Sequence, residues 1–205
     1  MAVEPTQQGW IAPYRVWLSE AESLHNAMLV AQFFLPRSWS TNAIAAMCGN
    51  MRVESSVNPD MYEYGYDWED DRGYGLVQWT PRSKYWNWAV SQGLPPREGD
   101  SQLMRIVYEQ ENGLQWIATQ DYPITFTQFT QSTEDVEWLT EAFTWNYERP
   151  NEQAGWESMP QRKAFASLVY EEIEDFDPSP PRPDIDPYFI MMGARRHRRR
   201  NFIRR

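Results

Sequence analysis

The sequence predicts a mainly helical α+β domain with a small β-hairpin or loop lobe and an extended arm at each end. Most of the chain between residues 19 and 176 carries apolar side chains at the three- and four-residue spacing of amphipathic helices. Residues 62–79 lose that period and place glycines among aromatic side chains, which is typical of a hairpin or a long structured loop. Prolines interrupt both ends of the chain, and a length of 205 residues fits one domain.

Four segments follow from these patterns. We expect residues 1–18 to form an extended N-terminal arm and residues 19–176 to form the folded domain. Residues 177–187 are rich in proline and predict an extended linker, and residues 188–205 combine a short apolar plug with an arginine-rich tail.

Residues 19–35 and 40–56 are the first two predicted helices. The first begins with a capping box made by Ser19 and Glu22, and Pro36 ends it. The second carries methionine and alanine side chains at steps of four along one face.

Further helices are predicted after the glycine-rich segment. Asp100 is the expected N-cap of one of them, Gly113 follows its end, and Pro160 is expected in the first turn of the last helix. The predicted ranges are 82–92, 100–112, a short helix followed by a loop within 116–130, a helix from about 133 to 149, and 160–176.

Glu54 is an acidic side chain on the apolar face of the second predicted helix. It lies three residues after Met51 and seven after Met47, where an apolar residue is expected. Burial in an apolar setting and the partial negative charge of a helix C-terminus both favour the protonated carboxyl group. A protonated carboxyl group can serve as a general acid, whereas the alternative is a structural glutamate that hydrogen-bonds the following loop.

A general acid of this kind can protonate a glycosidic oxygen, and most glycoside hydrolases pair it with a second carboxylate. The segment after Glu54 supplies candidates for that second carboxylate. We prefer Asp71, just before the glycine turn, and then Asp70; most of the acids in this segment must simply be solvated. The candidates are Glu63, Asp67, Glu69, Asp70 and Asp71.

Other chemistries lack the residues they require. An EF-hand would need glycine and glutamate where Arg72 and Gln78 stand, which leaves at most a weak cation site. His25 and His197 are the only histidines, so neither a Ser-His-Asp arrangement nor a tetrahedral zinc site is expected. We therefore assign no cofactor and no metal ligand.

Charge and targeting signals bear on partners. The net charge is −10, but residues 182–205 are basic, so the acidic body excludes nucleic-acid binding along its surface. The tail contacts either packaged nucleic acid or an acidic protein surface, unless it is only a solvated tail. The chain begins without the basic and apolar regions of a secretion signal, and its longest apolar run, residues 27–35, is too short to span a membrane.

Three motifs carry a resemblance to a known family. The runs AIAAMCGNMRVESSVNP, GYGLVQWTPR and AFTWNYERP resemble the phage tail lysozymes, which are muramidase domains of bacteriophage tail proteins and endolysins. More loosely, ES..NP followed by GL.Q is similar to soluble lytic transglycosylases, which share the lysozyme-type α+β fold. The resemblance covers about residues 19–176.

The resemblance implies Glu54 as the catalytic acid. It implies substrate contacts from Tyr74, Gln78, Trp79, Asn146 and Tyr147. The acidic insert between Pro59 and Gly73 departs from the family pattern, so the second carboxylate is not assigned, and Glu54 alone would give an anhydro-sugar product.

The function implied is cleavage of the bond between N-acetylmuramic acid and N-acetylglucosamine by a muramidase carried in the phage tail to the host cell wall. A structural tail protein with an inactive lysozyme-like fold, a lytic transglycosylase and a soluble endolysin are the alternatives. We expect peptidoglycan as substrate, and phage tail proteins as partners of the N-terminal arm and the arginine-rich tail.

Overall fold

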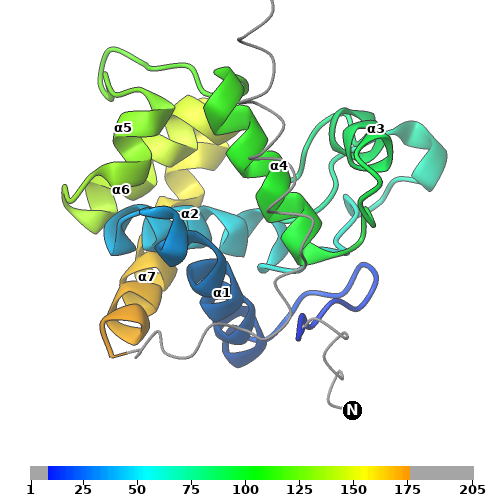
Figure 1. Cartoon of the computed structure of the whole chain (residues 1–205), viewed down its shortest axis with the longest axis horizontal. Coiled ribbons are helices and arrows are strands. Elements are labelled where there is room, and N and C mark those ends of the chain that lie inside the picture. The colour runs from blue at the N-terminus through cyan, green and yellow to red at the C-terminus, as the bar shows by residue number, and fades with distance from the viewer. Residues whose placement is uncertain (1–8, 176–205) are drawn as a thin grey trace, which may run out of the picture.

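The computed structural model describes residues 9–175, and its fold is mainly helical, as predicted (Figure 1). The α-helices are α1 (Glu20–Phe34), α2 (Thr41–Ser55), α3 (Ser83–Ser91), α4 (Gly99–Asn112), α5 (Phe126–Gln131), α6 (Val136–Phe143) and α7 (Glu152–Glu174). Two 3-10 turns, Leu35–Arg37 and Trp68–Asp70, and a π-helix, Thr144–Glu148, complete the described elements.

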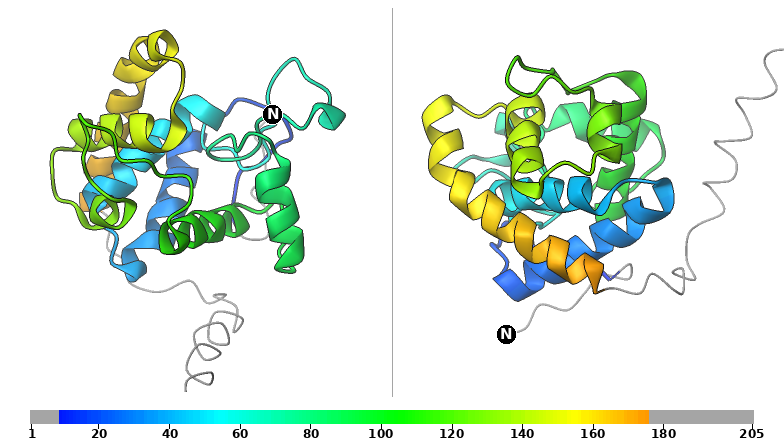
Figure 2. Two further views of the ribbon diagram at one scale, coloured as in Figure 1. Left: turned by 90° about the horizontal axis from the view of Figure 1, so that it is seen from above. Right: turned by 90° about the vertical axis from the view of Figure 1, so that its left-hand side faces the viewer.

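Helix α2 lies at the centre of the helical lobe. Helices α1, α6 and α7 pack against it, and α3 lies beside α4 in a second lobe together with the loop that follows α2 (Figures 1 and 2). α2 is buried along most of its length, including the face opposite the predicted apolar one. Its central position explains why small residues occupy so much of its surface.

Gly49 permits the closest contact in this lobe. A Cβ atom there would lie 2.4 Å from the backbone oxygen of Arg162 and 2.8 Å from the Cβ atom of Ala166 on α7. Only a glycine therefore allows α7 to approach α2 at this point. This approach brings Arg162 to the C-terminal end of α2.

The predicted hairpin or loop segment is a structured loop. Within residues 9–175 no β-strand forms; isolated antiparallel bridges join Tyr62 to Tyr74 and Tyr74 to Trp79. Gly75 has a positive φ of 81°, and a Cβ atom there would lie 2.4 Å from Oε1 of Gln102. The turn is therefore fixed by its contact with α4.

Residues 9–18, part of the expected N-terminal arm, pack against the domain itself. Trp10 is fully buried, and its Nε1 donates to Oδ1 of Asp100 at 2.9 Å. Gly99 provides the space, since a Cβ atom there would lie 2.1 Å from the Trp10 ring. Leu18 is also buried, so this part of the arm belongs to the folded domain.

Several predicted helix boundaries differ from the structure. The last helix begins at Glu152 because the side chain of Asn151 caps it, and Pro160 lies inside it. In the 116–130 segment the loop comes first, since a capping box at Thr125 starts α5. The N-cap of α4 is Glu98, and Asp100 lies in the first turn, where it accepts from Trp10.

The proline-rich linker, the apolar plug and the arginine-rich tail lie outside the described residues, as do residues 1–8. Among the helices of residues 9–175, none has the length and apolar character required to cross a bilayer.

Candidate functional site

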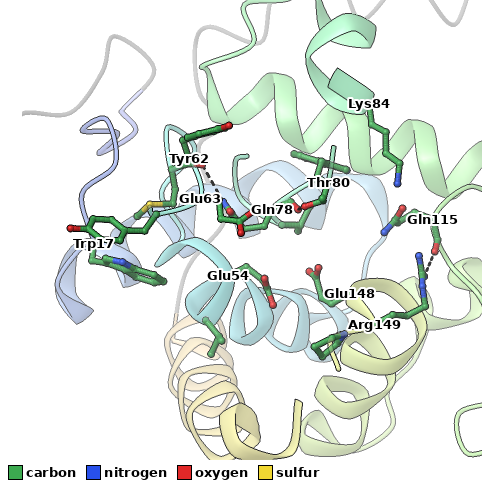
Figure 3. Close-up of a pocket in the computed structure, with 16 residues that line it drawn as sticks. Trp17, Glu54, Tyr62, Glu63, Gln78, Thr80, Lys84, Gln115, Glu148 and Arg149 are labelled. Atoms are coloured by element: carbon green, nitrogen blue, oxygen red, sulfur yellow. Dashed lines mark hydrogen bonds between the residues drawn. The ribbon is translucent and has the colours of Figure 1, made fainter. Parts of the chain in front are cut away.

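A pocket of about 570 Å³ lies between the helical lobe and the loop lobe. Glu54 and Glu148 lie near its middle (Figure 3), Trp17 stands at one end, and Lys84 and Arg149 stand at the other. The remaining lining residues are Val53, Met61, Tyr62, Glu63, Tyr64, Val77, Gln78, Trp79, Thr80, Gln115 and Pro150.

Glu54 ends α2 with its side chain 21% exposed and directed into the pocket. Nη2 of Arg162, from α7, donates to its Oε1 at 2.7 Å. The expectation of a purely apolar setting for Glu54 is therefore wrong. α2 is buried on several sides, so the face that looks apolar in sequence also meets a charged side chain from a distant helix.

Arg162 is itself held by several acceptors. Its side chain is 3% exposed, its Nη1 donates to Oδ1 of Asn50 at 2.7 Å, and its Nε donates to Oγ of Ser158 at 3.1 Å. Asn50 also accepts from Oγ1 of Thr144 at 2.7 Å. The guanidinium group is thus fixed by α2, α7 and the π-helix before any substrate binds.

Glu148 is the second carboxylate of the pocket, and it comes from the end of the π-helix. The backbone N–H of Arg149 donates to the carbonyl of Thr144 at 2.8 Å, and Arg149 adopts a left-handed φ of 52°. This wider turn changes the register of the side chains after Phe143. It turns Glu148 toward the pocket and Tyr147 into the core.

The surroundings of Glu148 favour its protonated form. The residue is half-buried, and its Oε1 is buried without a hydrogen-bond partner among the described residues. Burial raises the pKa of Glu148 well above the usual glutamate value, and the neighbouring carboxylate of Glu54 raises it further. The charge of Arg162 opposes these effects without cancelling them.

A buried network supports one wall of the pocket. Glu109, on α4, accepts from Nε1 of Trp79 at 3.0 Å, from Nε of Arg105 at 2.8 Å and from the hydroxyl of Tyr147. Burial raises the pKa of Glu109, while these three donors oppose the rise. The network joins Trp79, which follows the glycine turn, to Tyr147 in the π-helix, although these two residues are far apart in sequence.

Two of the five expected substrate-contacting residues line the pocket. Gln78 has a positive φ of 48°, and its Nε2 donates to the carbonyls of Met61 and Gly75 at 3.1 and 3.0 Å. Trp79 lines the pocket but is only 3% exposed and stacks on Tyr85 with ring centroids 4.6 Å apart. Both side chains shape the wall while they hold the loop in place.

The other three expected contacts are not in the pocket lining. Tyr74 is fully buried, and its hydroxyl donates to Asp60 at 2.7 Å. Asn146 is buried, and its Oδ1 accepts from the backbone N–H and the hydroxyl of Thr119, both at 2.9 Å. Tyr147 stacks on Phe143 with ring centroids 4.5 Å apart. All three side chains therefore support the fold, and the substrate contacts expected of them stay predictions.

The expected second carboxylates, Asp71 and Asp70, are not brought to Glu54, since neither lines the pocket. Oδ1 of Asp71 accepts from the backbone N–H of Ser83 at 2.7 Å and lies 3.7 Å from Nε of Arg82. Asp70 caps a 3-10 turn by accepting from the N–H of Asp67 at 2.9 Å. Within residues 9–175, no three or more histidine, cysteine or acidic side chains are grouped to hold a metal ion.

Sequence reasoning missed Glu148, Arg162, Glu109 and Trp17. Glu109 had a weaker signal than Glu54, since it lies three residues after the apolar Ile106 but seven after the polar Gln102. Glu148 lies within the AFTWNYERP run but had no signal of this periodic kind, because the π-turn breaks the helical spacing. Arg162 appeared as one of many charged residues on a long amphipathic helix.

Comparison with known proteins adds two findings. Residues 25–173 match the phage tail lysozyme family. Over 134 residues the chain is 43% identical to morphogenesis protein 1 of Bacillus phage B103. This match covers 65% of the present chain and 36% of the phage B103 protein, so the chain spans well under half of that relative.

Proposed function

The chain belongs to the phage tail lysozyme family, and from this premise we propose that it is a muramidase. It would cleave the glycosidic bond between N-acetylmuramic acid and N-acetylglucosamine in peptidoglycan. The observation that supports this most directly is the pair of glutamates, Glu54 and Glu148, at the middle of one pocket. Glycoside hydrolysis needs a proton donor and a second group that activates water or attacks the sugar.

The two carboxyl groups suit these roles because their surroundings differ. Glu54 is paired with Arg162 at 2.7 Å, which stabilises a negative charge on it. Glu148 has a buried oxygen and a raised pKa, so it holds a proton at pH values where an ordinary glutamate is ionised. The pair thus offers one proton and one negative charge to a glycosidic bond placed between them.

The proposal assigns catalysis to the pair rather than to Glu54 alone. A substrate that enters the pocket would take the proton from the pair as the leaving oxygen departs. The carboxylate of Glu54 then accepts the proton of an attacking water molecule, or itself attacks the sugar carbon. If the sugar's own hydroxyl attacks instead of water, the product is an anhydro-muramyl sugar, as in the transglycosylase alternative.

The test is the loss of turbidity of purified sacculi with the Glu54→Gln variant. We expect a rate at least ~100-fold below that of the parent protein, since the amide neither exchanges a proton nor attacks. Glu172→Gln, an exposed glutamate of α7, serves as the matched control and should retain the parent rate. Equal rates for Glu54→Gln and the parent would remove Glu54 from the mechanism. Mass spectrometry of the released muropeptides distinguishes reducing from anhydro-muramyl ends.

We further propose that the protein acts from a phage particle at the host cell wall. Membership of the family and the similarity to a phage morphogenesis protein support this. The name of that relative also favours the second candidate, a structural particle protein with an inactive lysozyme-like fold. Sacculi that stay intact after long incubation with the folded parent protein, at several pH values, would favour the structural candidate over the enzyme.

A further inference from the structure

One end of the pocket is built by a segment that the family match does not include. Trp17 lines the pocket together with Val53 and Glu54, yet it precedes residues 25–173, which match the family. At 55%, it is the most exposed tryptophan among the described residues. Its ring makes no aromatic or cation–π contact within residues 9–175, and more than half of the residue's surface is exposed at the end of the pocket.

The backbone around Trp17 is held firmly although its ring is exposed. The N–H of Leu18 donates to Oγ of Ser56 at 2.8 Å, and Nη1 of Arg52 donates to the carbonyl of Leu18 at 3.0 Å. On the other side, Nδ2 of Asn58 donates to the carbonyl of Val16 at 2.8 Å. A ligand that stacks on Trp17 therefore meets a preorganised surface, which lowers the entropy lost on binding.

A second exposed aromatic residue lines the same pocket. Tyr64 is 81% exposed, and the guanidinium carbon of Arg15 lies 5.8 Å from its ring centroid. Arg15 is itself positioned by donating to the carbonyl of Glu63 at 3.2 Å. The pocket therefore presents two exposed aromatic rings, and Arg15 lies over one face of the Tyr64 ring.

Open aromatic rings next to hydrogen-bonding groups suit a carbohydrate ligand. A sugar ring has an apolar face of C–H groups that packs on a flat aromatic side chain, while its hydroxyls and acetamido group remain at the polar edge. Trp17, Tyr64 and Glu54 line one pocket. A glycan whose scissile bond lies at Glu54 would therefore continue toward the two aromatic rings. An anionic protein partner would instead require a cluster of cations in the pocket lining at this end, and among the described residues the two cations of the lining, Lys84 and Arg149, lie at the other end.

We propose that Trp17 and Tyr64 form a stacking subsite for an N-acetylated amino sugar of the same glycan, on the Trp17 side of the bond at Glu54. This inference rests on the proposed muramidase function and adds the part of the substrate that the N-terminal segment binds. The subsite gives residues 9–18 a role within the domain.

The experiment measures binding of N-acetylglucosamine oligomers of two to six units to full-length protein by calorimetry. Glu54→Gln is present throughout to prevent turnover. Adding Trp17→Ala should weaken binding of the hexamer about tenfold, an effect in the range of one stacking contact. Binding of the shortest oligomers that still bind should change by less than twofold, and Trp17→Tyr should restore most of the hexamer affinity.

Trp156→Ala is the matched control, because Trp156 is 48% exposed and lies on α7 away from this pocket. It should bind every oligomer as the parent does. Equal hexamer affinity for Trp17→Ala and the parent would overturn the subsite, as would a uniform loss at all lengths. The proposed function is tested separately, by measuring cleavage of sacculi with the protein that retains Glu54. If that protein cleaves sacculi but Glu54→Gln binds no oligomer, the subsite is contradicted and the proposed function is not.

Discussion

Glu54 and Glu148 carry the same functional group, and their neighbours give them different chemistry. Arg162 lies 2.7 Å from Glu54, whereas Oε1 of Glu148 is buried without a partner among the described residues. An unpaired buried carboxyl oxygen favours the neutral acid, because the charged form would lose its solvation. The difference between the two residues is therefore a property of position.

Replacing Glu148 with glutamine should lower the rate of sacculus cleavage by at least ~100-fold, because the pair loses its proton. The pH profile is the more specific measurement. In the parent protein the rate should fall on the alkaline side, as pH rises through the raised pKa of Glu148. Any activity left in Glu148→Gln should lack that alkaline limb.

The matched control for this variant is Glu111→Gln, an exposed glutamate near the end of α4. It should keep both the rate and the alkaline limb. An unchanged pH profile in Glu148→Gln would show that the titrating group lies elsewhere in the protein.

At the scale of elements, the site depends on how closely α7 approaches α2. Arg162 reaches Glu54 and Asn50 because Gly49 leaves room for the backbone of α7. The π-helix acts in a comparable way, since its wider turn orients Glu148. Both effects come from the course of the backbone, and each one positions a side chain at the pocket.

Gly49→Ala should destabilise the protein by about 1–3 kcal/mol, because the added Cβ atom would lie 2.4 Å from the Arg162 carbonyl oxygen. Thermal unfolding should show a lower Tm. The direction of the change in stability is diagnostic, since glycine to alanine inside an unconstrained helix stabilises a protein by about 0.5–1 kcal/mol. A raised Tm with unchanged activity would mean that α7 does not press on α2 at this point.

At the scale of the whole molecule, several acids have pKa values raised above their usual range. Burial is the largest cause for Asp60, Glu98, Glu109 and Glu148. Such groups hold more protons in the folded state than in the unfolded state, so they favour folding below their ordinary pKa values, and that contribution is lost as pH rises through the raised values.

We therefore expect Tm to be higher at pH 5.5 than at pH 8, measured by thermal unfolding at constant ionic strength. Asp71 and Glu22 have lowered pKa values, so their stabilising contribution is already complete in this interval. The net charge of −10 acts in the same direction through self-repulsion, but salt screens that part. If the difference in Tm between pH 5.5 and pH 8 disappears fully at high salt, the role of the buried acids is contradicted.

The sequence alone determined the helical lobe and one carboxylate of the site. The period of apolar residues located α1 and α2, and the capping box at Ser19 fixed the start of α1, because both signals are local. Glu54 stood out for the same reason, as a charge at an apolar helix position. The family resemblance gave the fold class, which the family match and the helical architecture confirm.

Only the tertiary structure decided which side chains meet Glu54. Arg162 is 108 residues away in sequence, and Glu148 reaches the pocket through a π-turn that no helical spacing predicts. Asp71 fitted the pattern of a second acid, yet its carboxylate is used to hold the start of α3. Contacts between distant segments depend on packing and backbone register, and these arise from the whole fold rather than from neighbouring residues in the sequence.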